Sequence, residues 1–234
     1  MNRKAFTLIE IAMVICVIAV AAAGIFAAQM IAGTSDARGL VAQIQKYDQA
    51  IAGFRSQYHA LPGDVRNTIN QNLSPENTDG DNNGIITNQI LEITQANGEI
   101  TNFWLHLSQS KMLDENYDGA ENQLVRFGKT FPISKLGENA GIIVFGAEGK
   151  NFYQVGFKFA NIERIFTGNR SVTAEDALYF DKKIDDSNPQ KGRVTAAGGD
   201  SLNLPANEGC VKNNKYNVDV KSPFCQLKIG LDVK

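Results

Sequence analysis

An uninterrupted apolar segment near the N-terminus constrains this chain more than any other feature. Every residue from 11 to 28 is apolar or glycine, and no charged residue follows Glu10 until Asp36. About 20 apolar residues, each rising 1.5 Å along a helix, span the hydrocarbon core of a bilayer. Arg3 and Lys4 precede the segment, so the positive-inside rule predicts a cytoplasmic N-terminus and export of the rest of the chain.

The overall composition excludes several classes of protein. Of 234 residues, 43% are hydrophobic and 21% are charged, as in an ordinary globular domain. Lysine and arginine together number 23 against 25 acidic residues, and they are spread along the chain, so no nucleic-acid footprint is expected. There are only two histidines, and the chain has no phosphate-binding glycine loop, no serine-hydrolase elbow and no zinc-protease motif. We therefore expect a protein that is not an enzyme.

Glu10 is the unusual residue at the start of the apolar segment. A charge at the centre of a spanning helix costs about 2.5 to 3.5 kcal/mol, and such acids are usually kept for a partner. The alternative is that Glu10 lies in the headgroup layer without a role. The cost favours a functional carboxylate.

Residues 4–10, Lys-Ala-Phe-Thr-Leu-Ile-Glu, together with the apolar segment that follows, resemble the class III leader and N-terminus of type IV pilins and type II secretion pseudopilins. The resemblance implies that a prepilin peptidase cuts between Ala5 and Phe6 and methylates the new amine of Phe6. Ala5 stands where the family mostly has glycine. The resemblance covers about the first 30 residues.

The same resemblance implies a role for Glu10 in assembly. After cleavage Glu10 is the fifth residue of the mature chain, where the family's carboxylate is proposed to neutralise the terminal amine of a neighbouring subunit. Opposite charges attract strongly in a low-dielectric environment, so this pair would select the register of the subunits. The implied partners are further copies, other pilins, the inner membrane and its assembly platform. The implied location is the inner membrane with a periplasmic head, followed by a pilus or pseudopilus.

Other interpretations remain open at this point. Residues 21–23, three alanines, offer the cleavage site of a conventional signal peptide, which would release a soluble protein. A type II secretion pseudopilin and an exported calcium-binding module that never polymerises are alternatives to a pilus subunit. A periplasmic hydrolase that uses Asp181 or Asp185 is a more distant one.

An amphipathic pattern follows the apolar segment. Apolar residues recur at helical spacing, which predicts a helix that packs on a globular head; they are Leu40, Ile44, Tyr47, Ile51, Phe54 and Tyr58. We expect one helix from Phe6 to Tyr58 that ends at Pro62-Gly63. The predicted parts are a leader (1–5), a transmembrane and assembly helix (6–33), its amphipathic half (34–60) and a globular head (61–234).

The head has the patterns of an α+β unit. Residues 99–107 favour a helix with core Trp104, and Thr173 is a predicted N-cap of a second short helix. Residues 140–147 and 152–159 alternate like the strands of an antiparallel hairpin. The predicted fold is type IV pilin-like α+β, with a long N-terminal helix, half transmembrane and half packed on an antiparallel sheet, and a C-terminal globular head.

An Asp-rich stretch is a candidate calcium site. Asp79, Asp81 and Asn83 alternate before Gly84, as in the first half of an EF-hand loop. The twelfth position, where an EF-hand has its bidentate glutamate, is Ile90. A solvated turn rich in Asp and Asn is an equally good interpretation.

The cysteines and a later acidic cluster complete the candidates. Cys16 lies in the apolar segment and is expected to act as a small hydrophobe. Cys210 and Cys225 lie in the region predicted to be exported, so we expect a disulfide that stabilises the fold by about 3 kcal/mol. Asp181, Asp185 and Asp186 are interspersed with lysines, which favours a solvated charged face over a metal site or a catalytic pair.

Overall fold

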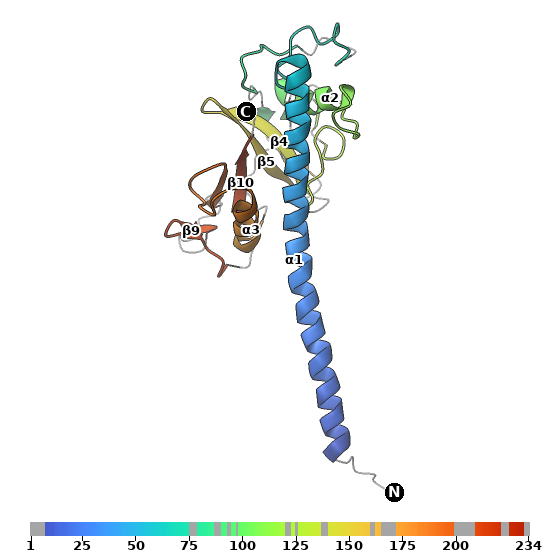
Figure 1. Ribbon diagram of the computed structural model, residues 1–234, viewed down its shortest axis with the longest axis vertical. Coiled ribbons are helices and arrows are strands. Elements are labelled where there is room, and N and C mark those ends of the chain that lie inside the picture. Colours follow the sequence, from blue (N-terminus) through green and yellow to red (C-terminus); the bar gives the residue numbers. More distant parts are fainter. Residues whose placement is uncertain are drawn as a thin grey trace.

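A single long helix and a head at one end of it define the shape of the molecule (Figure 1). A computed structural model describes residues 8–74, 79–86, 90–92, 95–96, 98–119, 123–124, 126–136, 140–159, 162–164, 172–198, 209–220 and 225–231. Helix α1 (Leu8–Tyr58) contains 51 residues. Its C-terminal half lies against the head, whereas its N-terminal half extends away from the head (Figure 1).

The structure contradicts the predicted transmembrane half of this helix. Within the part of the chain that the structure describes, no helix is both long and apolar enough to cross a membrane. The pilin-like fold with a half-transmembrane helix and the single-pass inner-membrane location are both corrected by this finding.

Among the described residues, the main sheet of the head is antiparallel and contains five strands. Its order is β4 (Ala140–Ala147), β5 (Lys150–Phe159), β10 (Cys225–Gly230) and β7 (Val194–Gly198), and β6 (Ile162–Arg164) also pairs with β5. The predicted hairpin is confirmed, because Ala140 to Ala147 pair in register with Phe157 to Lys150. The C-terminal strand β10 lies between β5 and β7, so the end of the chain completes the sheet.

Smaller elements surround this sheet. Short strands β1 (Ile90–Glu92), β2 (Gln95–Ala96) and β3 (Gln123–Leu124) form a second sheet, and β8 (Val211–Lys212) pairs with β9 (Lys215–Tyr216). Helix α2 (Glu99–Gln109) is almost wholly buried. Helix α3 (Ala174–Ile184) begins at the predicted cap, since the Thr173 hydroxyl accepts a hydrogen bond from the backbone N–H of Asp176 at 3.1 Å.

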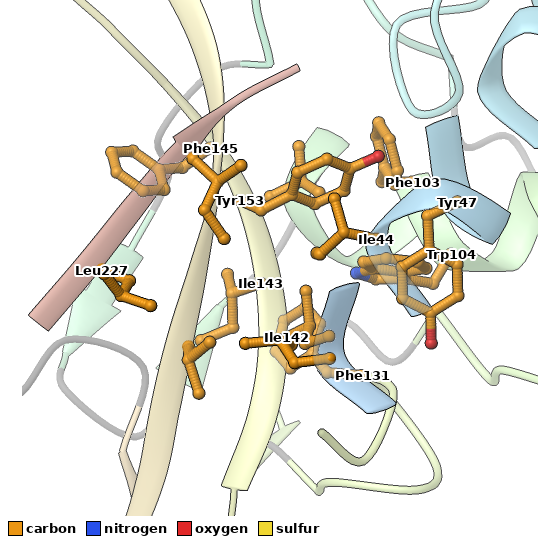
Figure 2. Close-up of a cluster of buried hydrophobic side chains, with 14 of the residues drawn as sticks. Ile44, Tyr47, Phe103, Trp104, Phe131, Ile142, Ile143, Phe145, Tyr153 and Leu227 are labelled. Atoms are coloured by element: carbon orange, nitrogen blue, oxygen red, sulfur yellow. The ribbon is translucent and has the colours of Figure 1, made fainter. Parts of the chain in front are cut away.

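The core lies where α1, α2 and the sheet meet (Figure 2). Tyr47 of α1 makes an edge-to-face contact with Trp104 of α2, with ring centroids 4.8 Å apart, and it lies 6.5 Å from the ring of Tyr153 on β5. The amphipathic stripe predicted from the sequence is confirmed as the buried face of α1. Its fully buried members are Leu40, Ile44, Tyr47, Ile51 and Phe54, and Tyr58 is half-buried.

Within the described part of the chain, two ion pairs join the packed half of α1 to the head. Arg193, just before β7, donates from Nη2 to both carboxylate oxygens of Asp48, at 2.8 and 2.6 Å, and this pair is mostly buried. Lys46 and Glu115 form a second pair at 2.7 Å, but about 45% of each side chain is exposed. The buried pair therefore contributes more to holding the helix on the sheet.

Candidate functional site

The N-terminal half of α1 presents a continuous apolar surface. From residue 8 to residue 20 every described side chain is exposed. The large apolar side chains are exposed by 48 to 89%; they are Leu8, Ile9, Ile11, Met13, Val14, Ile15, Val17, Ile18 and Val20. Soluble monomers rarely expose apolar surface of this extent, and such surfaces mark sites of association.

Glu10 lies in the first turn of α1 and is exposed. The N-terminus of a helix carries a partial positive charge, so a carboxylate there is stabilising by roughly 0.3 to 1 kcal/mol. This position gives Glu10 a local role in addition to any role in assembly. Ala5 and Phe6, the predicted cleavage and methylation residues, lie outside the described residues.

The three cysteines have different environments. Cys210 and Cys225 form the predicted disulfide, which joins the strand pair β8–β9 to the start of β10. Cys16 is a free thiol on the exposed half of α1. Its side chain is exposed within this single chain, as are the apolar side chains around it.

A group of three acidic residues lies where the end of α1, the Asp-rich loop and the start of α2 meet. Asp64, Asp81 and Glu99 each offer a carboxylate oxygen, and these oxygens lie within 4.8 Å of one another. Asp64 and Glu99 are buried, whereas Asp81 is exposed. Carboxylates grouped in this way can hold a metal ion, and oxygen ligands favour a hard cation.

Two glycines allow the three segments of this site to approach closely. Gly63 has a φ of +85°, and a Cβ there would lie 2.4 Å from the backbone oxygen of Glu99. A Cβ on Gly80 would lie 2.4 Å from the Cα of Asp64. Since a side chain fits at neither position, glycine is required to bring the loop and α2 against the end of α1.

Within this group, the ionised form of Asp64 is disfavoured by its surroundings. Burial, together with the nearby negative charge of Glu99, raises the pKa of Asp64 to about 6. Backbone N–H groups partly compensate, because Asn83 and Gly84 donate to its two oxygens at 3.1 and 2.7 Å. A bound cation would neutralise the remaining excess of negative charge.

Only one of the three predicted calcium ligands belongs to this group. Asp81 does, but Asp79 accepts hydrogen bonds at 2.8 Å from the backbone N–H and the hydroxyl of Thr68. These bonds lower the pKa of Asp79 and fix a turn. Asn83 lies beside the group, with its side-chain oxygen accepting from the N–H of Ile85 at 2.7 Å.

The sequence did not reveal Asp64 and Glu99 as site residues. Their separation from Asp81 along the chain leaves no local spacing to recognise. The available signals were indirect: Asp64 follows the Pro-Gly stop of α1, and Glu99 begins the next helix. Only the folding of α2 against the end of α1 brings them together.

The second acidic cluster is only in part the solvated face that the sequence favoured, since Asp186 is exposed but the other two carboxylates are not. Asp181 is fully buried and accepts hydrogen bonds from the Tyr216 hydroxyl at 2.8 Å and the Ser187 N–H at 3.1 Å. Asp185 accepts from the backbone N–H groups of Arg193 and Val194. Asp181, Asp185 and Asp186 also offer oxygens close to one another, but the first two hold the surrounding loops in place.

His106 is a structural histidine within the core. It is fully buried, and its Nδ1 accepts a hydrogen bond from the backbone N–H of Gly63 at 2.9 Å. Burial lowers the pKa of His106 to about 4, so the side chain is neutral at pH 7. It links α2 to the turn that ends α1.

Comparisons with known proteins add no relative. No protein-family model, no curated protein and no solved structure matches this chain.

Proposed function

We propose that the protein is a structural subunit of a type IV pilus-like filament, in which the N-terminal halves of α1 from successive copies pack together. The observation that supports this proposal is the continuous exposed apolar surface of residues 8–20. A pseudopilus of a type II secretion system is the alternative filament for the same subunit. The role is structural, and no catalytic residue is part of it.

Burial of apolar surface supplies the driving force for this assembly. Removing apolar surface from water contributes about 25 cal/mol per Å². The N-terminal half of α1 extends beyond the head, so it is accessible to the helices of other copies (Figure 1). Contacts that repeat between different surfaces of successive copies, without closing into a ring, generate a filament.

In this proposal a prepilin peptidase cuts between Ala5 and Phe6, and Glu10 sets the register of the subunits. The new terminal amine, four residues before Glu10 in the sequence, pairs with Glu10 of a neighbouring copy. Inside a bundle of helices an uncompensated charge is strongly penalised. Only the register that pairs the two charges therefore avoids the penalty.

The most direct test replaces an exposed isoleucine in each region of the molecule. Ile18 on α1 and Ile69 on the head are exposed by 61 and 52%. Ile18→Asp should abolish filaments recovered by shearing and ultracentrifugation and seen by electron microscopy, whereas Ile69→Asp should leave their yield within about twofold. Neither change should alter the melting temperature of the head. Equal yields from the two variants would overturn the proposal.

A second experiment addresses processing and the role of Glu10. The mass of the protein purified from its native cells should correspond to a chain that begins at methylated Phe6. Glu10→Ala should keep this mass but reduce the filament yield at least tenfold, whereas Asp114→Ala, which removes an exposed carboxylate from the head, should not. Full assembly of Glu10→Ala would contradict the proposed pairing.

We also propose that the group of Asp64, Asp81 and Glu99 binds Ca²⁺. Three carboxylates are compatible with the oxygen coordination of Ca²⁺, and backbone carbonyls or water can complete its shell. The raised pKa of Asp64 supports this assignment, because burial and the neighbouring charge of Glu99 disfavour its carboxylate form, which a bound cation would stabilise. A cation here would tie the Asp-rich loop to both α1 and α2.

The test is the thermal stability of the head with and without the cation. A ligand at 100 times its Kd adds about 2.7 kcal/mol, which raises the melting temperature of a head of this size by about 5 °C or more. Ca²⁺ should produce this rise relative to EDTA in the wild type and in Asp114→Asn, but not in Asp64→Asn. No rise in the wild type would overturn the calcium proposal and would leave the filament proposal unaffected. The same titration with Mg²⁺ measures the selectivity.

A further inference from the structure

A cavity of the head borders the loop at Gly84 that also bonds Asp64, but its lining has the opposite charge to the acidic site. It has a volume of about 720 Å³ and opens where the β4–β5 turn, the end of β10 and the segment before β7 meet. We call it the basic cavity. Its charged and aromatic lining residues are Glu148, Lys150, Phe152, Lys191, Arg193 and Lys228.

The basic cavity concentrates positive charge in a protein whose net charge is −2. Of its four cationic side chains, Arg193 is already paired with Asp48 and also donates from Nε to the backbone oxygen of Gly230 at 2.7 Å. Among the described residues, the ammonium groups of Lys150, Lys191 and Lys228 form no ion pair. One carboxylate, Glu148, lines the same cavity, so an excess of positive charge remains.

Lys228 is held in position by aromatic rings. Its Nζ lies 3.9 Å from the ring centroid of Phe152 and 5.8 Å from that of Phe145. Side chains alternate along a strand, so Lys228 and Phe152 lie on the face of the sheet opposite Tyr153, which packs on α1. The cation–π contact restrains the ammonium group but leaves its hydrogen-bond donors available to an anion.

The walls of the basic cavity are fixed by hydrogen bonds. Arg193 holds the end of β10, and the side chain of Asn151 holds the loop at Gly84 and Ile86 through bonds of 2.8 Å each. At Gly149 a Cβ would meet no atom within 4 Å, so the β4–β5 turn leaves the entrance open. Preformed cavities of about 300 to 1,000 Å³ are typical of small-molecule sites.

We propose that the basic cavity binds a compact organic anion that carries at least two negative charges, on phosphate or carboxylate groups. Three ammonium groups from three different segments can contact separate charged groups of one ligand. Lysine is a compact charge with three donors, which suits both phosphate and carboxylate oxygens. The face of Phe152 offers an apolar surface to the body of the ligand. This site is independent of filament assembly.

The test is calorimetric titration of the full chain without divalent cations. The probes are glucose 6-phosphate, tricarballylate and, as the neutral control, glucose. At least one of the two anions should bind, and glucose should not. Binding of only glucose 6-phosphate assigns phosphate as the recognised group, binding of only tricarballylate assigns carboxylate, and binding of both assigns charge alone.

Matched variants locate the binding. Lys228→Gln and Lys191→Gln should each weaken anion binding about fivefold or more, whereas Lys215→Gln should leave it unchanged, since Lys215 is an exposed lysine on β9 outside the cavity. Lys191 lies in an exposed segment, so its replacement keeps the test valid if Lys228→Gln lowers the stability of the sheet. Failure of both anions to bind at millimolar concentration, or equal losses in all three variants, would overturn the proposal.

Discussion

The two halves of α1 share one helical geometry but differ in what covers them. In residues 36–58 the large apolar side chains recur every three or four positions, and the head fully buries Leu40, Ile44, Tyr47, Ile51 and Phe54. In residues 8–20 the apolar side chains surround the helix, and all are exposed. The first pattern identifies a face that the same chain covers. The second identifies a surface that this chain leaves to other molecules.

The largest expected difference in the free energy of unfolding is between isoleucine-to-alanine substitutions in the two halves of α1. Ile44 is fully buried between α1 and the sheet, whereas Ile18 is 61% exposed. Ile44→Ala should lower the free energy of unfolding of the head by about 2 to 5 kcal/mol. Ile18→Ala should change it by less than about 0.5 kcal/mol, as expected of exposed positions. Urea unfolding of both variants measures the contrast, and equal losses would contradict the distinction between the halves.

The next effect concerns pH and tests the contact between the packed half of α1 and α2. The folded pKa of His106 is about 4 against an unfolded value near 6.5, so the folded state favours the neutral side chain. The neutral imidazole therefore contributes on the order of 3 kcal/mol to the free energy of unfolding. This contribution is fully present above pH 6.5 and is lost as the pH falls through 4.

Comparison with His106→Gln isolates this contribution from that of other groups. Between pH 6.5 and 4 the free energy of unfolding should fall by less in His106→Gln than in the wild type. Denaturant unfolding at several pH values gives both curves. Parallel curves would show that the buried imidazole does not govern this range.

A smaller effect separates the two ion pairs that hold α1 on the head. Asp48→Ala removes the mostly buried partner of Arg193 and should cost about 2 kcal/mol, because a hydrogen-bonded charge loses its compensation. Glu115→Ala removes the partner of Lys46 at an exposed site and should cost about 0 to 1 kcal/mol. Thermal unfolding compares them, and a larger loss for Glu115→Ala would reverse the assignment.

Local patterns in the sequence predicted local structure well. The spacing of Leu40, Ile44 and Phe54 identified the buried face of α1, and alternation identified the β4–β5 hairpin. Thr173 was recognised as a cap because the residues that complete it are its neighbours. In each case the pattern that identifies the element lies in the spacing of residues that are close along the chain.

Interactions between distant segments could not be predicted. Asp181 was expected in solvent, but Tyr216, 35 residues away, encloses it. The pairing of Asp48 with Arg193 spans 145 residues. The prediction of a transmembrane segment was wrong for a related reason. An apolar sequence shows that a surface is unfavourable in water, but it does not specify what covers that surface.

The most direct test of the central claim uses Cys16 as a native probe. It is a free thiol within the exposed half of α1, and the other two cysteines form a disulfide. In intact filaments a charged maleimide should leave Cys16 unlabelled, and labelling should become complete after denaturation; in Ile69→Cys filaments the head thiol should react in both states. Labelling of Cys16 in intact filaments as fast as in denatured protein would show that the N-terminal halves of α1 are not packed together, contrary to this account.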